Sequence, residues 1–117
     1  MLRLLHASRN TWNGLLAAAR SEKAVQQELV LLVIAVPLAF VVATDTWRRL
    51  ALIGVVLFVL VVELLNTGLE KLADHVTLDR HPAIGFVKDV ASAAVALSLL
   101  LAALVWLVAL GERLGFI

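Results

Sequence analysis

Three long apolar segments constrain this chain most strongly, because they limit the folds in which it can be stable. Residues 29–43, 50–62 and 90–110 contain no Asp, Glu, Lys or Arg. The whole sequence is 62% hydrophobic and 16% charged, with a mean hydropathy of +1.00, whereas soluble domains are nearer half apolar and a quarter charged. Apolar blocks of this kind are typical of helices that cross a bilayer. The sequence therefore predicts an all-α membrane protein.

The predicted spans lie at about 26–44, 47–72 and 88–110, and the one long loop is expected at 74–88. The length of the chain allows one membrane domain, residues 1–117, and not two. A bundle of three spans would enclose a polar stripe poorly. We therefore expect an oligomer.

Residues 2–20 are predicted to form an amphipathic helix before the first span. One of its faces is apolar, and the opposite face is polar and partly basic. The apolar face holds Leu5, Trp12, Leu15, Leu16 and Ala19, and the polar face holds Arg3, His6, Asn10, Asn13 and Arg20. Such a helix lies in the membrane interface or packs on its own bundle, and the sequence favours neither.

A stripe of polar residues follows the second apolar segment, with no helix-breaking residue between them. It consists of Glu63, Asn66, Glu70 and Asp74. At 100° per residue these fall at roughly 0°, −60°, −20° and +20° around a helix, over about 16 Å of its length. A carboxylate at bilayer depth is costly and usually functional. We therefore expect the stripe to belong to a functional site.

The distribution of Lys and Arg predicts the orientation of the chain. One end of the predicted bundle holds Arg3, Arg9, Arg20, Lys23, Lys71, Arg80 and Lys88, and the other holds Arg48, Arg49 and Arg113. Because basic segments remain in the cytoplasm, the N-terminus and the loop are predicted to be cytoplasmic and the C-terminus outside. Glu22, Glu28, the end of the stripe and the loop then share one cytoplasmic interface.

Composition and motifs exclude several classes of chemistry. The chain has no cysteine, which excludes disulfides, thiolate catalysis and iron–sulfur clusters, and its net charge of +1 gives no case for nucleic acid binding. Its six glycines form neither of the phosphate-binding patterns G-x-x-x-x-G-K-[ST] and G-x-G-x-x-G. Its three histidines have spacings unlike those of a zinc site.

The remaining polar groups are carboxylates, one amide and a Lys-Asp pair. Oxygen ligands suit Mg²⁺, which one or two carboxylates usually hold together with substrate phosphates. A carboxylate near such an ion can take a proton from a hydroxyl group. Lys88 and the basic N-terminal helix would neutralise phosphate charge. These residues predict phosphoryl transfer without a nucleotide-binding domain.

Two motifs resemble those of the prokaryotic diacylglycerol kinase family. The first is Glu63-Leu64-Leu65-Asn66-Thr67 with Glu70 and Asp74, and the second is Lys88-Asp89 with Ser92-Ala93-Ala94-Val95. The resemblance extends over nearly the whole chain through Arg3, Thr11-Trp12, Gly14-Leu15, Glu22 and Gln27-Glu28. The pattern E-[IL]-L-N-[ST]-x-[IL]-E with Lys-Asp at this distance is highly specific.

The resemblance implies a small homotrimeric kinase of the bacterial inner membrane, which transfers the γ-phosphate of ATP to a lipid hydroxyl at sites between subunits. It implies that Glu63 is the general base and that Asn66 orients Glu63 or a phosphate. It implies that Glu22 and Glu70 bind the Mg²⁺ that bridges the ATP phosphates. Further nucleotide contacts are implied for Arg3, Asp74, Asp79, Arg80, His81, Lys88 and Asp89. Lipid contacts are implied for Arg3, Trp12, Gln27, Glu28, Glu63 and Ser92.

Diacylglycerol is the expected acceptor, with phosphatidic acid as the product. Undecaprenol is the alternative, because the loop His81-Pro82-Ala83 resembles the undecaprenol kinase branch of the family. An alternative of another class is a small transporter in which Glu63 carries protons or cations. That function gives no reason for Glu22 and Lys88-Asp89 to lie on one side of the membrane.

Several of these residues also have a purely structural interpretation. Lys88-Asp89 would be an ion pair at the start of a helix, Trp12 and Ser92 would be packing residues, and Glu63 would only hold helices together.

Overall fold

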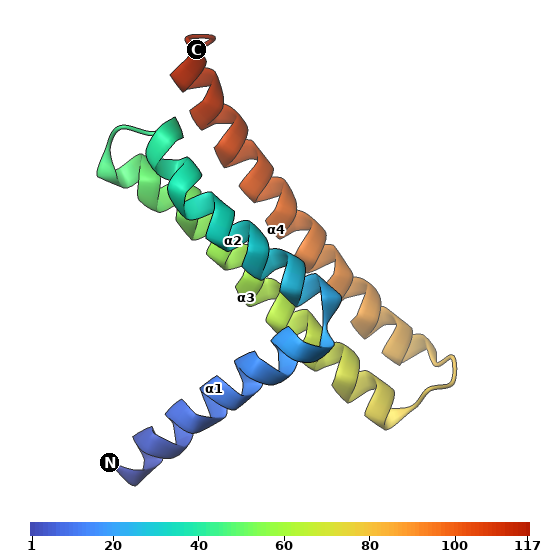
Figure 1. The fold of residues 1–117 in the computed structure, drawn as a ribbon. Coiled ribbons are helices and arrows are strands. Elements are labelled where there is room, and N and C mark those ends of the chain that lie inside the picture. Colours follow the sequence, from blue (N-terminus) through green and yellow to red (C-terminus); the bar gives the residue numbers. More distant parts are fainter.

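The computed structural model describes residues 1–117, and all of its regular elements are helices. They are α1 (Leu2–Ser21), α2 (Lys23–Val42), α3 (Thr46–Val76) and α4 (Pro82–Leu114). In Figure 1 the helices α2, α3 and α4 lie side by side, each antiparallel to the one before it, and α1 projects from one end of this bundle. Each of the three bundle helices is long and apolar enough to cross a membrane. The predicted all-α fold with three spans is confirmed.

The turns between helices are set by residues that end or cap them. Glu22 alone separates α1 from α2, with an extended backbone (φ −110°, ψ 115°). Asp45 caps α3, because its Oδ2 accepts a hydrogen bond from the Arg48 backbone N–H at 3.2 Å. His81 caps α4 through its Nδ1, which accepts from the backbone N–H two residues on at 3.2 Å. Pro82 follows as the first helical residue, where a missing N–H costs nothing.

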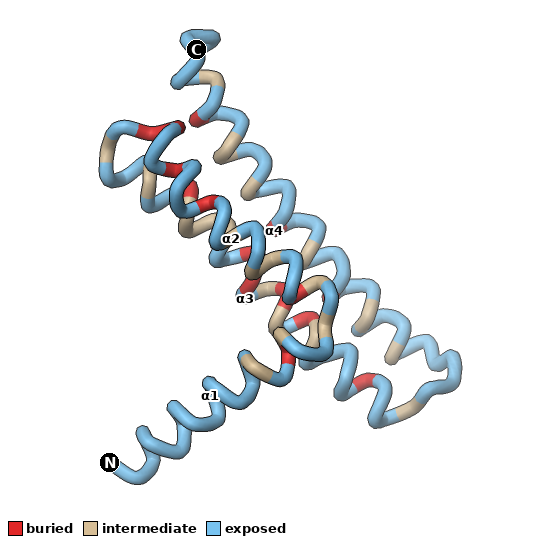
Figure 2. Tube along the Cα trace, in the orientation of Figure 1, coloured by how far each residue is buried: buried red, intermediate tan, exposed pale blue.

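The buried core is small and follows α3, which packs against both α2 and α4. Only 15 of the 117 residues are buried (Figure 2). At the end of the bundle away from α1, Leu52 is enclosed with Ala39 and Ala109, and its carbonyl accepts a hydrogen bond from Trp106 Nε1 at 3.0 Å. Small residues at these contacts let the helices approach closely.

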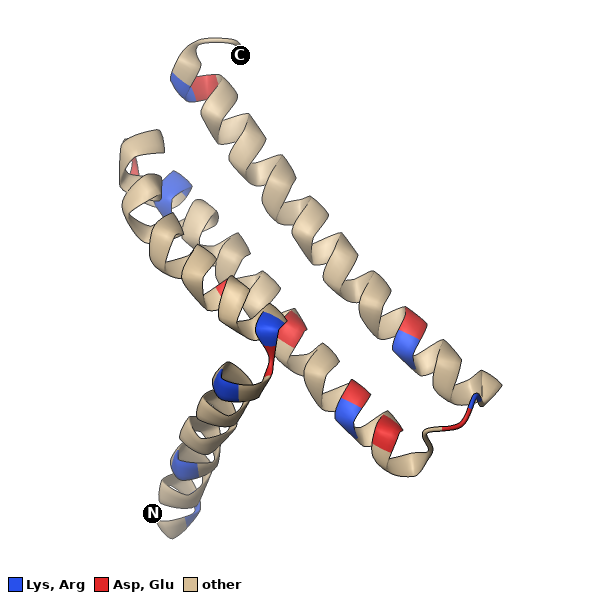
Figure 3. Ribbon diagram, turned by 45° about the vertical axis from the view of Figure 1, so that its right-hand side comes forward, with Lys and Arg blue, Asp and Glu red and all other residues tan.

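Most charged residues of the bundle helices lie toward the two ends of the bundle, and the segments between them are apolar (Figure 3). Large side chains in the middle are mostly exposed, for example Val33 at 73%, Leu97 at 66% and Leu107 at 65%. An apolar surface of this extent would be unstable in water, whereas helices with satisfied backbones and apolar exteriors suit a bilayer. The chain is therefore a membrane protein with three spans.

The loop between the last two spans is shorter than predicted. α3 continues to Val76 and α4 begins at Pro82, so residues 77–81 alone are outside helices. The prediction of a loop at 74–88 was wrong because polar residues beyond a span do not break a helix when solvent can reach them. The helical pattern simply continues past the apolar segment.

The first helix does not pack along its own bundle. Ala18 is its one buried residue, and its contacts with α2 lie close to the joint at Glu22. Leu5 and Trp12, on its apolar face, are 58% and 62% exposed. The exposure of this apolar face favours a position of α1 in the membrane interface over packing on its own bundle.

Candidate active site

The polar stripe lies on one continuous helix, α3, as predicted, and its members differ in exposure. Glu63 and Asn66 are 7% and 8% exposed, whereas Glu70 and Asp74 are exposed near the cytoplasmic end predicted from the basic residues. Asn66 Nδ2 donates a hydrogen bond to Glu70 Oε1 at 3.1 Å. The stripe therefore leads from a buried carboxylate to a solvated one, with an amide between them.

Glu63 lies within electrostatic range of three other carboxylates. Glu28, from α2, lies close enough for its charge to act on Glu63, and so do Glu22, at the joint of α1 and α2, and Glu70, on α3 itself. Like charges from three parts of the chain thus act on one another near a buried carboxylate. Like charges in such surroundings are stabilised by a cation or a proton.

The side chains near Asn66 and Lys71 offer oxygen atoms of the kind that a hard divalent cation prefers. Glu22 and Glu70 offer carboxylate oxygens, and Asn66 Oδ1 is a buried acceptor with no hydrogen-bond partner. No three His, Asp or Glu side chains converge tightly enough to hold an ion by themselves. The protein would thus supply only part of the ligand shell, as proteins commonly do for Mg²⁺ bound with phosphate groups.

Glu22 is held at α3 by an ion pair that the sequence did not reveal. Lys71 Nζ lies 3.1 Å from Glu22 Oε1. The pair borders a cavity of about 550 Å³ in the angle between α1 and α3, which Asn10, Thr11 and Gly68 also line. From the sequence, Lys71 is predicted only to contribute to the orientation of the chain. Its position directly after Glu70 was the available signal for a role in the site.

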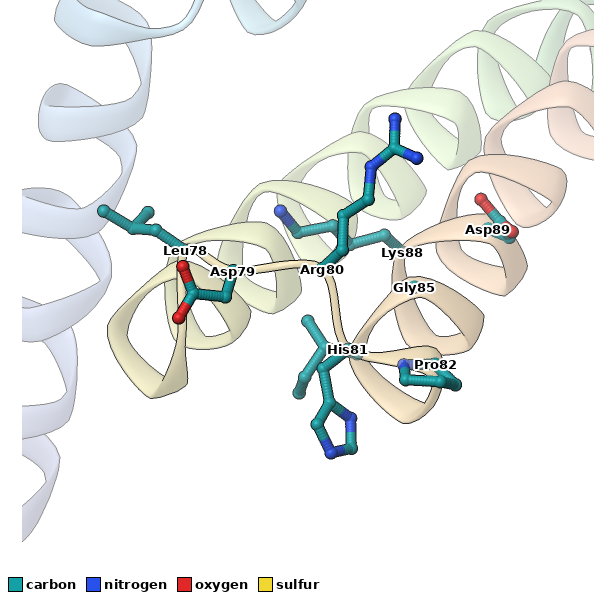
Figure 4. A pocket seen from close by; sticks show the side chains of 9 residues that line it. Leu78, Asp79, Arg80, His81, Pro82, Gly85, Lys88 and Asp89 are labelled. Carbon is teal, nitrogen blue, oxygen red and sulfur yellow. The ribbon is translucent and has the colours of Figure 1, made fainter.

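A second cavity, of about 710 Å³, is formed by the loop and the start of α4. Figure 4 shows its lining residues, which include five of those predicted to bind the nucleotide: Asp79, Arg80, His81, Lys88 and Asp89. Lys88 reaches across to α3, where its Nζ lies 2.6 Å from Asp74 Oδ1. This ion pair joins the loop cavity to the polar stripe. Lys88 thus forms its ion pair with Asp74 and not with the adjacent Asp89.

Several predicted contacts are not brought to Glu63 within one chain. Arg3 and Trp12 lie on the exposed part of α1, which points away from the bundle (Figure 1). Gln27 and Ser92 are exposed on the surfaces of α2 and α4. Nothing in a single chain assigns a partner to these four side chains.

Comparison with known proteins places this arrangement in a family. The profile of the family described as "Prokaryotic diacylglycerol kinase" matches residues 9–110. Over 104 residues the chain is 38% identical to the diacylglycerol kinase of Pseudomonas aeruginosa, which covers 89% of this chain and 85% of the relative. Over 113 residues it is 34% identical to the diacylglycerol kinase of Escherichia coli strain K12, covering 97% and 93%. The relative from Haemophilus influenzae is 32% identical over 103 residues, covering 88% and 87%. The chain has three membrane spans and a buried carboxylate, and these matches extend over almost its full length. It therefore belongs to the prokaryotic diacylglycerol kinase family of bacterial membrane lipid kinases.

Proposed function

We propose that this protein transfers the γ-phosphate of ATP to the hydroxyl of diacylglycerol, giving phosphatidic acid and ADP. The observation that carries the proposal is the buried Glu63 beside Asn66, next to a charged rim that holds further carboxylates and lysines. A lipid hydroxyl and a water-soluble triphosphate can meet only where bilayer and solvent adjoin, and Glu63 lies where the apolar segment of α3 gives way to its charged end.

Glu63 is proposed to act as the general base. The lipid hydroxyl oxygen attacks the γ-phosphorus, the bond from that phosphorus to the bridging oxygen of ADP breaks, and the hydroxyl proton passes to the Glu63 carboxylate. Its burial, at 7% exposure, keeps bulk water away from the position where the proton would be taken. Asn66, whose amide donates to Glu70, is proposed to orient Glu63 or a phosphate.

Glu22 and Glu70 are the residues that we propose hold Mg²⁺. The ion would neutralise the phosphate charge of ATP. Glu70 is already oriented by the Asn66 amide, and Glu22 is already drawn to α3 by Lys71. Both side chains are therefore near the stripe before any ion binds.

The loop cavity is the proposed nucleotide site. Arg80, His81 and Lys88 offer donors for phosphate or base, and Asp79 and Asp89 offer acceptors. The Lys88–Asp74 ion pair is exposed, with side-chain exposures of 41% and 45%, and such pairs are weak. Lys88 can therefore leave Asp74 for a phosphate oxygen at small cost.

The lipid and the remaining contacts are proposed to come from a homotrimer. Three of the expected lipid contacts are exposed, namely Trp12, Gln27 and Ser92, and an acyl lipid or a neighbouring chain would cover them. Glu28 lies within electrostatic range of Glu63. Arg3 projects from the bundle and would reach the nucleotide of a neighbour. The exposed apolar surface of the spans gives neighbouring chains an area to pack on. We propose the bacterial inner membrane as the location, with α1 and the loop in the cytoplasm.

The test is a competition for radiolabelled phosphate. Purified protein in mixed micelles receives labelled ATP, Mg²⁺ and equal amounts of diacylglycerol and undecaprenol. We expect label in phosphatidic acid, and no label when Mg²⁺ is omitted. Label in undecaprenyl phosphate would show that undecaprenol, and not diacylglycerol, is the acceptor. Label in neither lipid would overturn the kinase proposal in favour of ion transport by Glu63.

A further inference from the structure

Lys71 provides the cation that contacts Glu22. Its Nζ lies 3.1 Å from Glu22 Oε1, and the charges of Glu70 and Asp74 attract it as well. Lys88, the other lysine nearby, is paired with Asp74 at 2.6 Å. The positive charge of Lys71 therefore offsets the mutual repulsion of Glu22, Glu70 and Asp74.

Glu22 is free to exchange its partner. It is the single residue between α1 and α2, and its side chain caps neither helix. Apart from Lys71, the one hydrogen-bond partner of its side chain is the hydroxyl of Ser21, at 3.5 Å. The Lys71 side chain is 69% exposed and that of Glu22 is 23% exposed. An ion pair with one partner in solvent is weak, so another cation can take the place of the ammonium group.

We propose that Lys71 is a positioning residue that forms an ion pair with Glu22 until a divalent cation binds the carboxylate in place of the ammonium group. The proposal rests on the proposed function, because it takes Glu22 and Glu70 as ligands of that cation. In the metal-free protein the ammonium group keeps Glu22 against α3 and offsets its repulsion from Glu70. When the ion binds, the Lys71 side chain turns into solvent. The consequence is competition, so Lys71 lowers the affinity of the site for the ion.

The experiment measures metal binding and does not depend on turnover. The full chain in lipid nanodiscs is titrated with Mn²⁺ alone, and free Mn²⁺ is followed by its paramagnetic resonance signal. Lys71→Gln is compared with Lys23→Gln, which removes the same charge beside Glu22 from an exposed lysine that forms no ion pair. We expect the Mn²⁺ Kd of Lys71→Gln to be about two- to fivefold lower than that of Lys23→Gln. Lys71→Arg should retain the wild-type Kd.

A second comparison isolates the pair. In a chain that already carries Glu22→Gln, adding Lys71→Gln should not tighten Mn²⁺ binding, because the competed carboxylate is gone. Equal Kd values for Lys71→Gln and Lys23→Gln, weaker binding by Lys71→Gln, or no protein-bound Mn²⁺ in any variant would each overturn the proposal. The proposed function is judged separately, by transfer of label to lipid in the wild-type protein. If the Mn²⁺ Kd shifts as expected but no label reaches lipid, the proposed kinase function is overturned, whereas the competition between Lys71 and the ion for Glu22 stands.

Discussion

Glu63 is a carboxylic acid kept from solvent on a helix whose neighbouring turns carry Asn66 and Glu70. Burial of such a group costs stability unless it is paired or protonated. No lysine, arginine or histidine forms an ion pair with it. The residue is therefore better explained by chemistry than by stability.

Replacing Glu63 by Gln tests that explanation. The amide keeps the size of the side chain but cannot take a proton, so we expect turnover to fall by about 10²- to 10⁴-fold while ATP binding is retained. Label transfer and nucleotide binding are measured on the same preparation. Glu112→Gln, at the opposite end of the bundle, is the control and should turn over like wild type. Equal activity in Glu63→Gln would remove the base assignment.

Asp45 gives a prediction about pH. The backbone N–H of Arg48, and next its side chain, hold the pKa of Asp45 below the ordinary value for aspartate. A lowered pKa means that the charged form stabilises the folded state above the ordinary pKa, and that this contribution is lost as the pH falls through the lowered pKa.

Asp45→Ala should therefore be less stable than wild type at neutral pH, and the difference should shrink in acid. Unfolding in detergent mixtures, followed by circular dichroism across this pH range, provides the measurement. Thr44→Ala changes the preceding exposed residue and should show no such pH dependence. A difference that persists below the lowered pKa would contradict the capping role.

The helices themselves are held by few specific contacts, since apolar side chains gain little by leaving lipid for one another. The Trp106 indole bonds the carbonyl of Leu52 and so ties α4 to α3. At the same end, Arg48 bridges Asp45 at 3.0 Å and Glu112 at 2.9 Å. Polar contacts thus fix the end of the bundle that lies opposite the candidate site.

Trp106→Phe should destabilise the bundle. The ring is preserved but the N–H donor is lost, so we expect a decrease of about 0.5–1.5 kcal/mol in the free energy of unfolding. Trp47→Phe is the matched control, because Trp47 is 78% exposed and makes no indole hydrogen bond within the chain. Reversible unfolding in mixed micelles compares the two. A loss as large in Trp47→Phe would show that the hydrogen bond to Leu52 is unimportant.

At the scale of the whole molecule, the two charged ends have different roles. The end that bears α1, the loop and Lys71 carries the candidate site, and the other end is closed by ion pairs. A triphosphate is confined to the cytoplasm, so the proposed function requires the first of these ends to lie there.

Single cysteines test that orientation, because the natural chain has none. In intact cells an impermeant maleimide should label Thr44→Cys and Ile117→Cys, which are exposed at one end. It should label Ser8→Cys only after lysis. Each variant is checked for label transfer to confirm its fold. Labelling of Ser8→Cys in intact cells would reverse the orientation and contradict the site of ATP use.

The sequence by itself determined the membrane class, the three spans and the helix that precedes them, because apolar blocks and period-3.6 patterns are local properties of a chain. It also placed Glu63, Asn66, Glu70 and Asp74 on one helical face, since angular position on a helix depends only on spacing. Helix ends were less predictable. Solvated polar residues at 74–76 and 82–88 extend the two helices, so the loop is confined to residues 77–81.

Only the tertiary structure decided which separate segments meet. The approach of Glu28 to Glu63, the pairing of Glu22 with Lys71 and the bridge from Lys88 to Asp74 all depend on how helices pack across one another. The direction of α1 likewise depends on the extended backbone of Glu22, which the sequence does not predict. Contacts between residues distant in the chain follow from packing angles and side-chain directions, and neither is written in the spacing of one segment.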